Sequence, residues 1–252
     1  MLYRDIVELL REQIAIENLE RFFEKFSYCS IRMYNHKILF KDVEAVFRGK
    51  NVTHLKGSKS AIKEIENHYK LTNKILKVYK ENNTKLSSNL IRQFHYELMN
   101  GCYGEELLSK GERIGKFRKS DYGVTLYNLK LQLMGVEECL NSLIQEVNQL
   151  EFNERTALKN VSYFYCWFRH IHPFAYGNGR LGRLLINYLL IINNFPPVVI
   201  FENDKDEYYS ALQYFESKYD CYKMNKFLEE QLYKTWIKNY NLKQKSLKDF
   251  LD

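Results

Sequence analysis

Apolar residues recur at intervals of three and four along most of this chain, which is the spacing of one face of an α-helix. In IVELLREQIAIENLERFF the apolar positions on this spacing are Ile6, Leu9, Leu10, Ile14, Ile16, Leu19 and Phe22. The same spacing returns in residues 60–80, 88–100, 130–150, 154–170, 181–194, 205–217 and 223–239. A period of two, typical of a β-strand, is confined to a short stretch near Tyr122 to Tyr127. The pattern predicts a mainly α fold.

The sequence contains no break that indicates a second domain. Its 252 residues are enough for one domain with a substantial core or for two small ones, but no glycine- or serine-rich linker separates two halves. The longest apolar run, LLINYLLII, is interrupted by Asn187 and is about half as long as a membrane span. The amino-terminal residues are charged throughout, unlike a secretory signal. We therefore expect a single cytoplasmic domain that does not enter a membrane.

Cysteine usage and net charge narrow the chemistry only slightly. The five cysteines are Cys29, Cys102, Cys139, Cys166 and Cys221. They form no C-x-x-C pair, so we expect reduced, mostly buried thiols. With 38 basic and 31 acidic side chains the net charge is +7, which permits anionic partners without requiring them. A basic cluster lacks any nucleic-acid-binding motif beside it, so we interpret it as a solvated face; its members are Lys110, Arg113, Lys116, Arg118 and Lys119.

The segment HPFAYGNGRLGR, from His172 to Arg183, carries the most specific chemistry. Its glycine-rich turn lets backbone amides approach a ligand closely, and it opens a helix whose first N–H groups favour an anion. Arg180 and Arg183 stand three residues apart, on roughly one side of that first helical turn. His172 lies just upstream and, as a neutral imidazole, could remove a proton from an attacking hydroxyl. The segment therefore predicts a phosphate site and transfer of a group onto a hydroxyl, whereas His170 lacks further metal-ligand partners and is interpreted as a packing residue.

This segment resembles the motif of the Fic (filamentation induced by cAMP) family, H-x-F-x-D/E-G-N-G-R-x-x-R. The family transfers AMP from ATP to protein side chains, and every fixed position of its motif matches here except one. Tyr176 stands where the family has an acidic residue that holds Mg²⁺ against the phosphates. Mg²⁺ is thus expected from the family but doubtful for this chain, because a neutral phenol is a poor ligand for a hard cation.

The resemblance extends over about residues 28–235 and implies a domain layout. Residues 1–50 would hold N-terminal helices, including an inhibitory helix like that of the self-inhibited Fic class; residues 51–235 would form the Fic core, and 236–252 a tail. In that class the inhibitory signature is S/T-x-x-x-E-G/N, and its glutamate pairs with the motif's second arginine. Here the signature reads Ser30, Tyr34 and Asn35. A tyrosine cannot form that salt bridge with Arg183.

The resemblance also assigns roles to the site residues. His172 would be the general base and Phe174 would anchor the loop in the core. A short β-hairpin flap near residues 116–130 would dock a protein substrate by strand addition. Relatives often form homodimers, so a homodimer is an open possibility, and no nucleic acid is expected. The residues that would bind ATP are Gly177, Asn178, Gly179, Arg180 and Arg183 at the phosphates, and Asn187 and Tyr208 in the region that closes over the nucleoside, with Tyr208 nearer the adenine.

The substitutions at Tyr34 and Tyr176 leave three hypotheses open. The first is a pseudoenzyme that binds a nucleotide or phosphoester without turnover, since metal-assisted neutralisation would be lost. The second keeps catalysis without metal, or with another donor, because His172 and both motif arginines are present. The third, weaker hypothesis is a protein-binding module that ignores nucleotides. The activity that we expect is AMP transfer to a protein hydroxyl.

Overall fold

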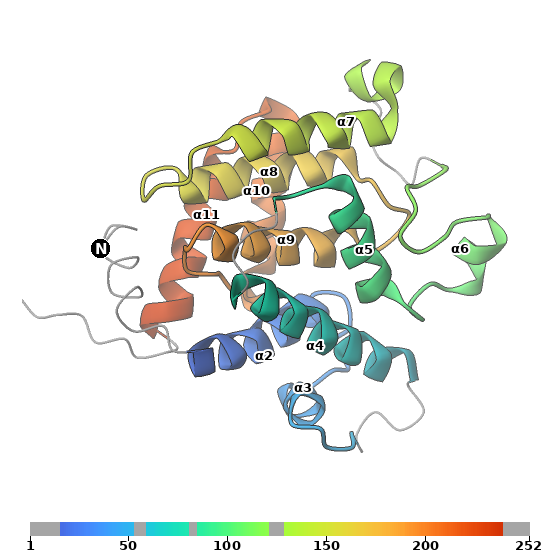
Figure 1. Cartoon of the computed structure of the whole chain (residues 1–252), viewed down its shortest axis with the longest axis vertical. Coiled ribbons are helices and arrows are strands. Elements are labelled where there is room, and N and C mark those ends of the chain that lie inside the picture. Colours follow the sequence, from blue (N-terminus) through green and yellow to red (C-terminus); the bar gives the residue numbers. More distant parts are fainter. Residues whose placement is uncertain (1–15, 53–58, 81–84, 121–128, 239–252) are drawn as a thin grey trace, which may run out of the picture.

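The computed structural model describes residues 16–52, 59–80, 85–120 and 129–238, and the described chain is mainly helical (Figure 1). Its α-helices are α2 (Ile16–Arg32), α3 (Phe40–Phe47), α4 (Lys59–Lys80), α5 (Ser88–Met99), α6 (Glu105–Ser109), α7 (Leu129–Gln149), α8 (Ala157–Ile171), α9 (Asn178–Ile192), α10 (Lys205–Lys218) and α11 (Tyr222–Tyr233). A 3-10 turn (Glu202–Asp204) precedes α10, and a π-helical turn (Lys234–Lys238) follows α11. Within the described ranges, no helix is long and apolar enough to cross a membrane.

The seven ranges that the apolar periodicity predicts between residues 60 and 239 each contain a helix. These helices are α4, α5, α7, α8, α9, α10 and α11. The largest internal deviation is in α7, where Gly135 has φ 78° and ψ 166° and interrupts the helix that the periodicity predicted as continuous. Glycine tolerates this backbone conformation because it has no Cβ. The beginning of α9 also differs from the predicted range. It starts at Asn178, three residues before the predicted range and inside the phosphate motif.

Two predictions about local structure come out differently. The inhibitory-helix signature, expected on one helix, begins in α2 with Ser30 but passes the end of that helix at Arg32. Tyr34 and Asn35 therefore lie in a turn, where the N–H groups of both donate to the Ile31 carbonyl at 3.0 Å. The β-hairpin flap falls mostly on residues 121–128, outside the described residues, and residues 116–120 form no strand. The flap and the single-domain layout remain predictions.

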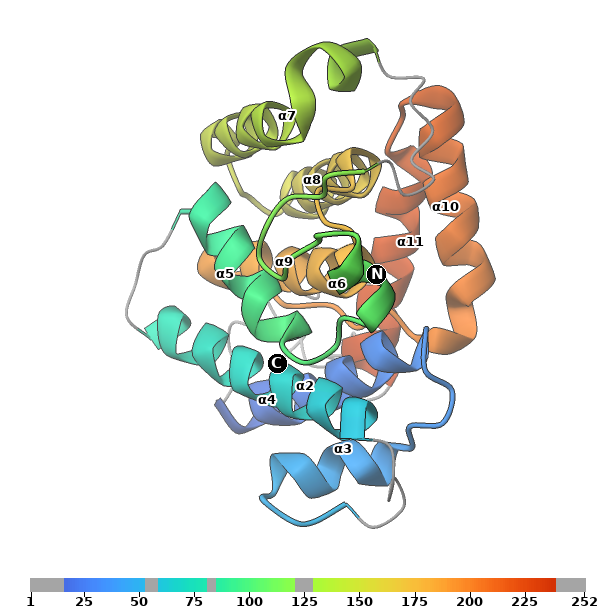
Figure 2. The same cartoon turned by 90° about the vertical axis from the view of Figure 1, so that its right-hand side faces the viewer.

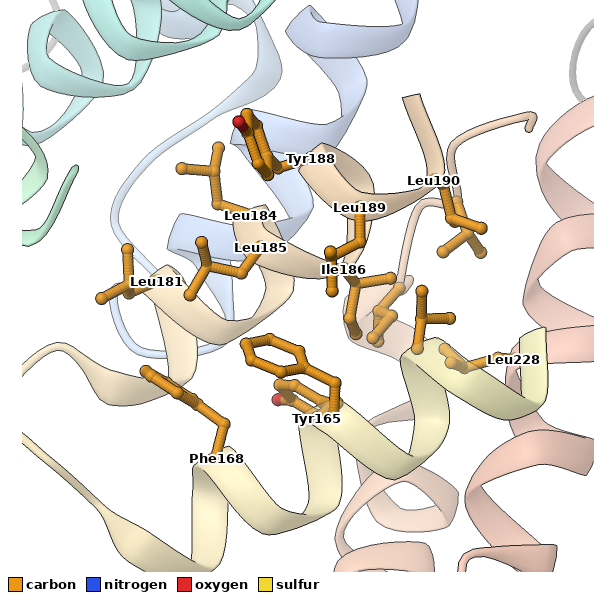
Figure 3. Packing of buried hydrophobic residues seen from close by; sticks show 14 of the residues in the cluster. Tyr165, Phe168, Leu181, Leu184, Leu185, Ile186, Tyr188, Leu189, Leu190 and Leu228 are labelled. Atoms are coloured by element: carbon orange, nitrogen blue, oxygen red, sulfur yellow. The ribbon is translucent and has the colours of Figure 1, made fainter. Parts of the chain in front are cut away.

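Helix α9 is the centre of the fold. Every residue from Asn178 to Ile191 is buried, as expected for a helix enclosed on all sides. Helices α7 and α8 lie on one side of it and α2, α3 and α4 on the other, an arrangement that both views show (Figures 1 and 2). Tyr165 and Phe168 of α8 meet the leucine-rich surface of α9 (Figure 3). This central position fixes both ends of α9 within the core.

The contact between α8 and α9 is unusually close at Gly182. A Cβ at this position would lie 2.6 Å from Cε2 of Tyr165 and 3.2 Å from Cδ1 of Phe168. Because such distances are too short for a side chain, glycine is what lets the two helices approach. The approach brings the carboxyl end of α8 and the amino end of α9 together, and the phosphate motif connects these two ends.

Truncation of a buried leucine on α9 should measure how strongly the fold depends on this helix. Leu185 is fully buried, and Leu185→Ala should lower the free energy of unfolding by about 2–5 kcal/mol, because the enclosed site cannot collapse around the cavity. The control is Leu150→Ala, at a leucine that is 39% exposed, with an expected change within about 0.5 kcal/mol. Denaturant unfolding of both variants makes the comparison. Equal small losses would contradict the central role of α9.

Candidate functional site

The motif loop begins where α8 ends, at His172. This residue has φ 50° and ψ 61°, in the left-handed region that non-glycine residues seldom adopt, and its N–H donates to the Phe168 carbonyl at 3.0 Å. Backbone in this region costs energy and persists only where surrounding contacts hold it. Two such contacts come from Arg118, whose Nε donates to the His172 carbonyl at 2.9 Å and whose N–H donates to the Pro173 carbonyl at 2.9 Å. The backbone of His172 is therefore held by α8 on one side and by Arg118 on the other.

The contacts of Arg118 correct one part of the sequence analysis. Arg118 was grouped with a solvated basic face, but its side chain is directed at the motif loop. Other members of the cluster fit the solvated interpretation, since Lys110 forms an exposed ion pair with Glu106 one helical turn away.

Phe174 anchors the loop in the core, as predicted. It is fully buried, and its ring stacks on that of His95 with a centroid distance of 3.7 Å. The Asn178 side chain closes the loop, because its Oδ1 accepts from the Phe174 N–H at 3.0 Å and its Nδ2 donates to the Phe174 carbonyl at 2.7 Å. The carboxamide of Asn178 is thus used within the protein, which leaves its backbone N–H, at the start of α9, for a ligand.

His95 is a structural residue of the site that the sequence analysis passed over. Its Nδ1 accepts from the Gly115 N–H at 2.9 Å, so its Nε2 donates to the Tyr176 carbonyl at 2.9 Å. Burial lowers the pKa of His95 to about 4, and the imidazole is neutral at pH 7. No local pattern distinguished His95 from the other histidines, because its partners lie 20 and 81 residues away in the sequence.

At the amino end of α9 no side chain caps the backbone N–H groups, although several side chains lie close to them. Gly177 precedes the helix with φ 88° and offers no side-chain cap. A Cβ on Gly177 would lie 2.9 Å from Cγ of Met99, so the turn requires glycine on grounds of space as well as φ. At Gly179 the neighbours are the hydroxyl of Tyr34 and Nη1 of Arg169. The free amides of a first helical turn, with the positive end of the helix dipole, favour negative charge here.

Arg180 lies at one side of this helix start and is 3% exposed. Its Nη1 forms an ion pair with Glu64 of α4, and its guanidinium lies over two tyrosine rings, 4.6 Å from the centroid of Tyr176 and 5.6 Å from that of Tyr34. Burial lowers the pKa of Arg180, but the charge of Glu64, its hydrogen bond to the guanidinium and the neighbouring Tyr176 together raise the pKa above its ordinary value. Arg180, which the sequence predicts to bind phosphate, is thus held by the carboxylate of Glu64, a residue that the sequence analysis did not identify.

Arg183 lies deeper and is 1% exposed. Its Nε donates to Ser30 Oγ at 3.1 Å and its Nη2 to the Ser30 carbonyl at 2.8 Å. Its Nη1 lies 3.5 Å from the hydroxyl of Tyr34 and 3.4 Å from that of Tyr208. The inhibitory-helix residues predicted from the sequence, Ser30 and Tyr34, therefore do contact the second arginine, although through hydroxyl and carbonyl oxygens rather than through a carboxylate.

The Tyr34 hydroxyl is strongly affected by the charges around it. Its side chain is 42% exposed as a whole, but its hydroxyl lies between Gly179, Arg183 and Arg169 and forms a hydrogen bond with Tyr209. Burial would raise the pKa of Tyr34, but the positive charges of Arg183 and Arg169 outweigh it and lower the pKa to about 7. Burial and the charge on Tyr34 raise the pKa of Tyr209 to about 12, so Tyr209 is the donor in this hydrogen bond. Near neutral pH, Tyr34 is partly a phenolate.

His172 is neutral at the same pH. Burial, with smaller contributions from the positive charges of Arg169 and Arg118, lowers its pKa to about 4. A neutral imidazole can accept a proton, which is the state required of a general base.

The residues near Tyr176 do not suit a divalent metal ion. Tyr176 is 41% exposed and offers a phenol, and its ring lies over the Arg180 guanidinium, whose charge repels another cation. Within the described part of the chain, no three His, Cys, Asp or Glu side chains lie close enough together to hold a metal. Mg²⁺ prefers carboxylate and phosphate oxygens, and the carboxylate that lies beside Arg180, that of Glu64, is already paired with the guanidinium.

The other predicted residues lie in the core. The Asn187 carboxamide bonds the backbone of Val198 through both its groups, at 3.0 and 2.7 Å. Tyr208 is fully buried, and its hydroxyl forms a hydrogen bond with the Tyr165 hydroxyl and accepts from Nη1 of Arg183 at 3.4 Å. The nucleoside contacts expected of these two residues remain predictions. His170 packs against Trp167, and its Nδ1 donates to Glu216 Oε2 at 2.7 Å, in agreement with its interpretation as a packing residue.

Comparisons with known proteins fit this geometry. Residues 85–190 match the model of the Fic/DOC family. A Fido domain-containing protein from Dictyostelium discoideum is 32% identical over 118 residues, a match that covers 42% of this chain and 80% of that protein. The chain belongs to the Fic/DOC family. The protein adenylyltransferase Fic of Aedes aegypti is 52% identical over 44 residues, but this match covers only 18% of the chain and 9% of that longer protein.

Solved structures of Fic proteins share the fold over most of the chain. A Fic domain-containing signaling protein from Bacteroides thetaiotaomicron superposes with a TM-score of 0.73 at 17% identity and covers 92% of this chain and 94% of its own. Fic-1 from C. elegans gives a TM-score of 0.73 at 14% identity and covers 96% of this chain and 70% of its own. At these identities the likeness concerns the Fic fold alone.

The depressed pKa of Tyr34 in this Fic domain can be measured directly. The folded pKa of about 7 lies below the ordinary value of about 10, so the unfolded state binds more protons between these two values. Relative to Tyr34→Phe, the wild-type protein should therefore gain stability as the pH rises from about 7 to about 10 and lose this gain as the pH falls through about 7. Tyrosinate absorbance and denaturant unfolding across this range provide the measurement. A pH-independent difference between the two proteins would contradict the assignment.

Proposed function

We propose that this Fic domain transfers AMP from ATP to a hydroxyl group of a protein. The observation that carries the proposal is that a neutral imidazole, His172, ends α8 beside the uncapped, arginine-flanked start of α9. A base and an anion site next to each other are what phosphoryl-group transfer to a hydroxyl needs. The names of the adenylyltransferase relatives support AMP as the transferred group.

Each part of the site has a separate task in this proposal. His172 removes the proton of the acceptor hydroxyl, and the freed oxygen forms a bond to the α-phosphorus of ATP while the bond to the pyrophosphate breaks. The amides of the first turn of α9 and the motif arginines neutralise the negative charge that moves onto the leaving pyrophosphate. Because the residues around Tyr176 do not suit Mg²⁺, no step of this mechanism uses a metal ion.

The arrangement of the described residues is a closed form of the site. The Tyr34 hydroxyl lies against Gly179 and the Tyr34 ring lies over both motif arginines, so a phosphate can reach the start of α9 only after Tyr34 moves. Tyr34 lies in the turn after α2, outside regular helix, where a change of position costs few backbone hydrogen bonds. We therefore propose that transfer is slow until the turn after α2 moves and takes Tyr34 away from the start of α9.

Removal of the imidazole tests the proposed transfer. The full chain is incubated with α-labelled ATP and a cell lysate, with Mg²⁺ or with a chelator, beside His172→Ala. We expect label in protein with the wild type, at least about a hundredfold less with His172→Ala, and persistence of label in chelator. ATP binding to both proteins is measured on the same samples. Label that is independent of His172 would sink the proposed mechanism, and bound ATP without any label would favour a pseudoenzyme.

A nucleotide-binding pseudoenzyme is the second candidate, and one observation favours it. The position that carries the metal-ligand acid in the family motif is occupied by Tyr176, which packs on Arg180 instead of offering a carboxylate. A scaffold of this kind would bind ATP and act through protein partners without turnover.

Restoring an acid separates the two candidates. Tyr176→Glu should raise Mg²⁺-dependent labelling by about tenfold or more if the site still has the geometry for transfer, because a carboxylate would supply the missing oxygen ligand. Tyr176→Gln is the matched control, since it has the same shape without the charge. A gain with Tyr176→Glu alone supports a transferase held back by Tyr176. Equal behaviour of all three proteins, with ATP bound, supports the pseudoenzyme.

A further inference from the structure

Arg118 forms hydrogen bonds to two consecutive carbonyls of the motif loop. Its backbone N–H donates to the Pro173 carbonyl at 2.9 Å, and its Nε donates to the His172 carbonyl at 2.9 Å. Arg118 and His172 are 54 positions apart in the sequence, so tertiary packing brings them together. Arg118 therefore fixes two successive peptide groups at the point where the chain leaves α8.

Two local preferences oppose the backbone conformation of His172. With φ 50° and ψ 61° the residue lies in the left-handed region, which a side chain with a Cβ seldom adopts. His172 also precedes Pro173, and a residue before proline favours extended backbone because the proline ring crowds it in other conformations. A conformation that the local sequence disfavours persists only where tertiary contacts hold it, and the bonds from Arg118 are contacts of this kind.

The guanidinium of Arg118 connects the motif loop to a second stretch of chain. Its Nη1 donates to the Ser120 carbonyl at 3.1 Å, while its Nε donates to the His172 carbonyl. The N–H groups of a guanidinium point in fixed directions within one plane, so the two carbonyls are held at a defined separation. A lysine in this place would offer a single point charge and could not reproduce the arrangement.

The residues just before this arginine are themselves anchored to the core. The N–H of Gly115 donates to Nδ1 of His95, and its carbonyl accepts from Nε of Arg92 at 3.0 Å. The ring of Phe117 lies 5.7 Å from that of Phe174, the residue that anchors the motif loop. Residues 115–118 therefore form a fixed support along the motif loop, and the arginine acts from backbone that α5 holds in place.

The charge of Arg118 also reaches the imidazole of His172. Burial is the main cause of the low pKa of His172, about 4, and the positive charges of Arg169 and Arg118 lower the pKa further. These two arginines, one on α8 and one beside the motif loop, are the charged groups that act on the imidazole. Both favour the neutral form, which is the form that accepts a proton.

We propose that Arg118 is the positioning residue of the base, because its hydrogen bonds to the His172 and Pro173 carbonyls direct the His172 imidazole toward the acceptor hydroxyl. The inference rests on the proposed function, since it assigns Arg118 to the same transfer reaction. Arg118 acts through the backbone of His172 and not on the nucleotide. Its loss should therefore slow transfer and leave ATP affinity unchanged, because a displacement of about 1 Å in a catalytic group can slow a reaction by about a hundredfold.

The kinetics of Arg118→Met test this assignment, because methionine keeps much of the side-chain length and removes the guanidinium. The full chain transfers label from α-labelled ATP into a fixed amount of cell lysate at a series of ATP concentrations. We expect the maximal rate to fall about tenfold or more and the KM for ATP to change less than about twofold. Arg113→Met is the matched control, since the Arg113 guanidinium is exposed and donates to the Leu108 and Glu112 carbonyls instead of the motif loop.

Nuclear magnetic resonance of ¹³C-labelled histidine gives a second readout that needs no turnover. The His172 resonances are assigned by their absence in His172→Ala. In Arg118→Met the pKa of His172 should rise from about 4, because a positive charge is removed, and its Cα resonance should move away from the left-handed position. Arg118→Lys keeps the charge without the planar fork. It should retain the low pKa and recover only part of the rate.

Several outcomes would overturn the inference. One is a wild-type rate in Arg118→Met, and another is an equal loss of rate in Arg113→Met. A rise in the KM for ATP that accounts for the whole loss would place Arg118 at the nucleotide instead. If Arg118→Met does not fold, Arg118→Lys is compared in its place, and a wild-type rate with an unchanged His172 Cα resonance contradicts the assignment.

The two readouts separate this inference from the proposed function. If the wild-type protein binds ATP but transfers no label, the transferase fails and the resonance measurements alone decide the role of Arg118. A shifted Cα resonance and a raised pKa of His172 in Arg118→Met would then leave the positioning role standing. Unchanged values of both would remove it as well.

Discussion

Positive charge enclosed at the start of α9 is the constraint that shapes this site. The guanidinium of Arg169 meets the positive end of buried helix α9, which also carries Arg183, and the Glu64 carboxylate is bound to Arg180. Such an arrangement is expensive unless an anion joins it. The low pKa of the Tyr34 hydroxyl and the neutral state of His172 both follow in part from these charges.

The packing of the core holds the backbone around these charges in place. Close packing at Gly182 joins α8 to α9, and the stack of Phe174 on His95 ties the motif loop to α5. The left-handed backbone of His172 is stabilised by Arg118. His172 and the first turn of α9 are thus held in place by contacts with the core, so that the cost of ordering them is met during folding.

The two tyrosines that depart from the family pattern have different physical effects. Tyr176 covers Arg180 and removes the oxygen ligand that a metal ion needs, whereas Tyr34 reaches both motif arginines and the start of α9. A carboxylate in the place of Tyr34 would be charged at every physiological pH. A phenol whose pKa is lowered to about 7 is charged only in part near neutrality, so the charge that Tyr34 places beside the arginines changes with pH in that range.

The sequence by itself determined the mainly helical fold, the family, the phosphate motif and the burial of Phe174, because these depend on local periodicity and on a contiguous run of residues. Only the tertiary structure decided the parts played by His95, Glu64 and Arg169. The contacts of His95 and Glu64 join residues 20 to 116 positions apart, and Arg169 meets Gly179 only because α8 packs against α9. Local spacing carries no information about such contacts. The interaction of Tyr34 with Arg183, across 149 residues, likewise depends on how α2 packs against α9.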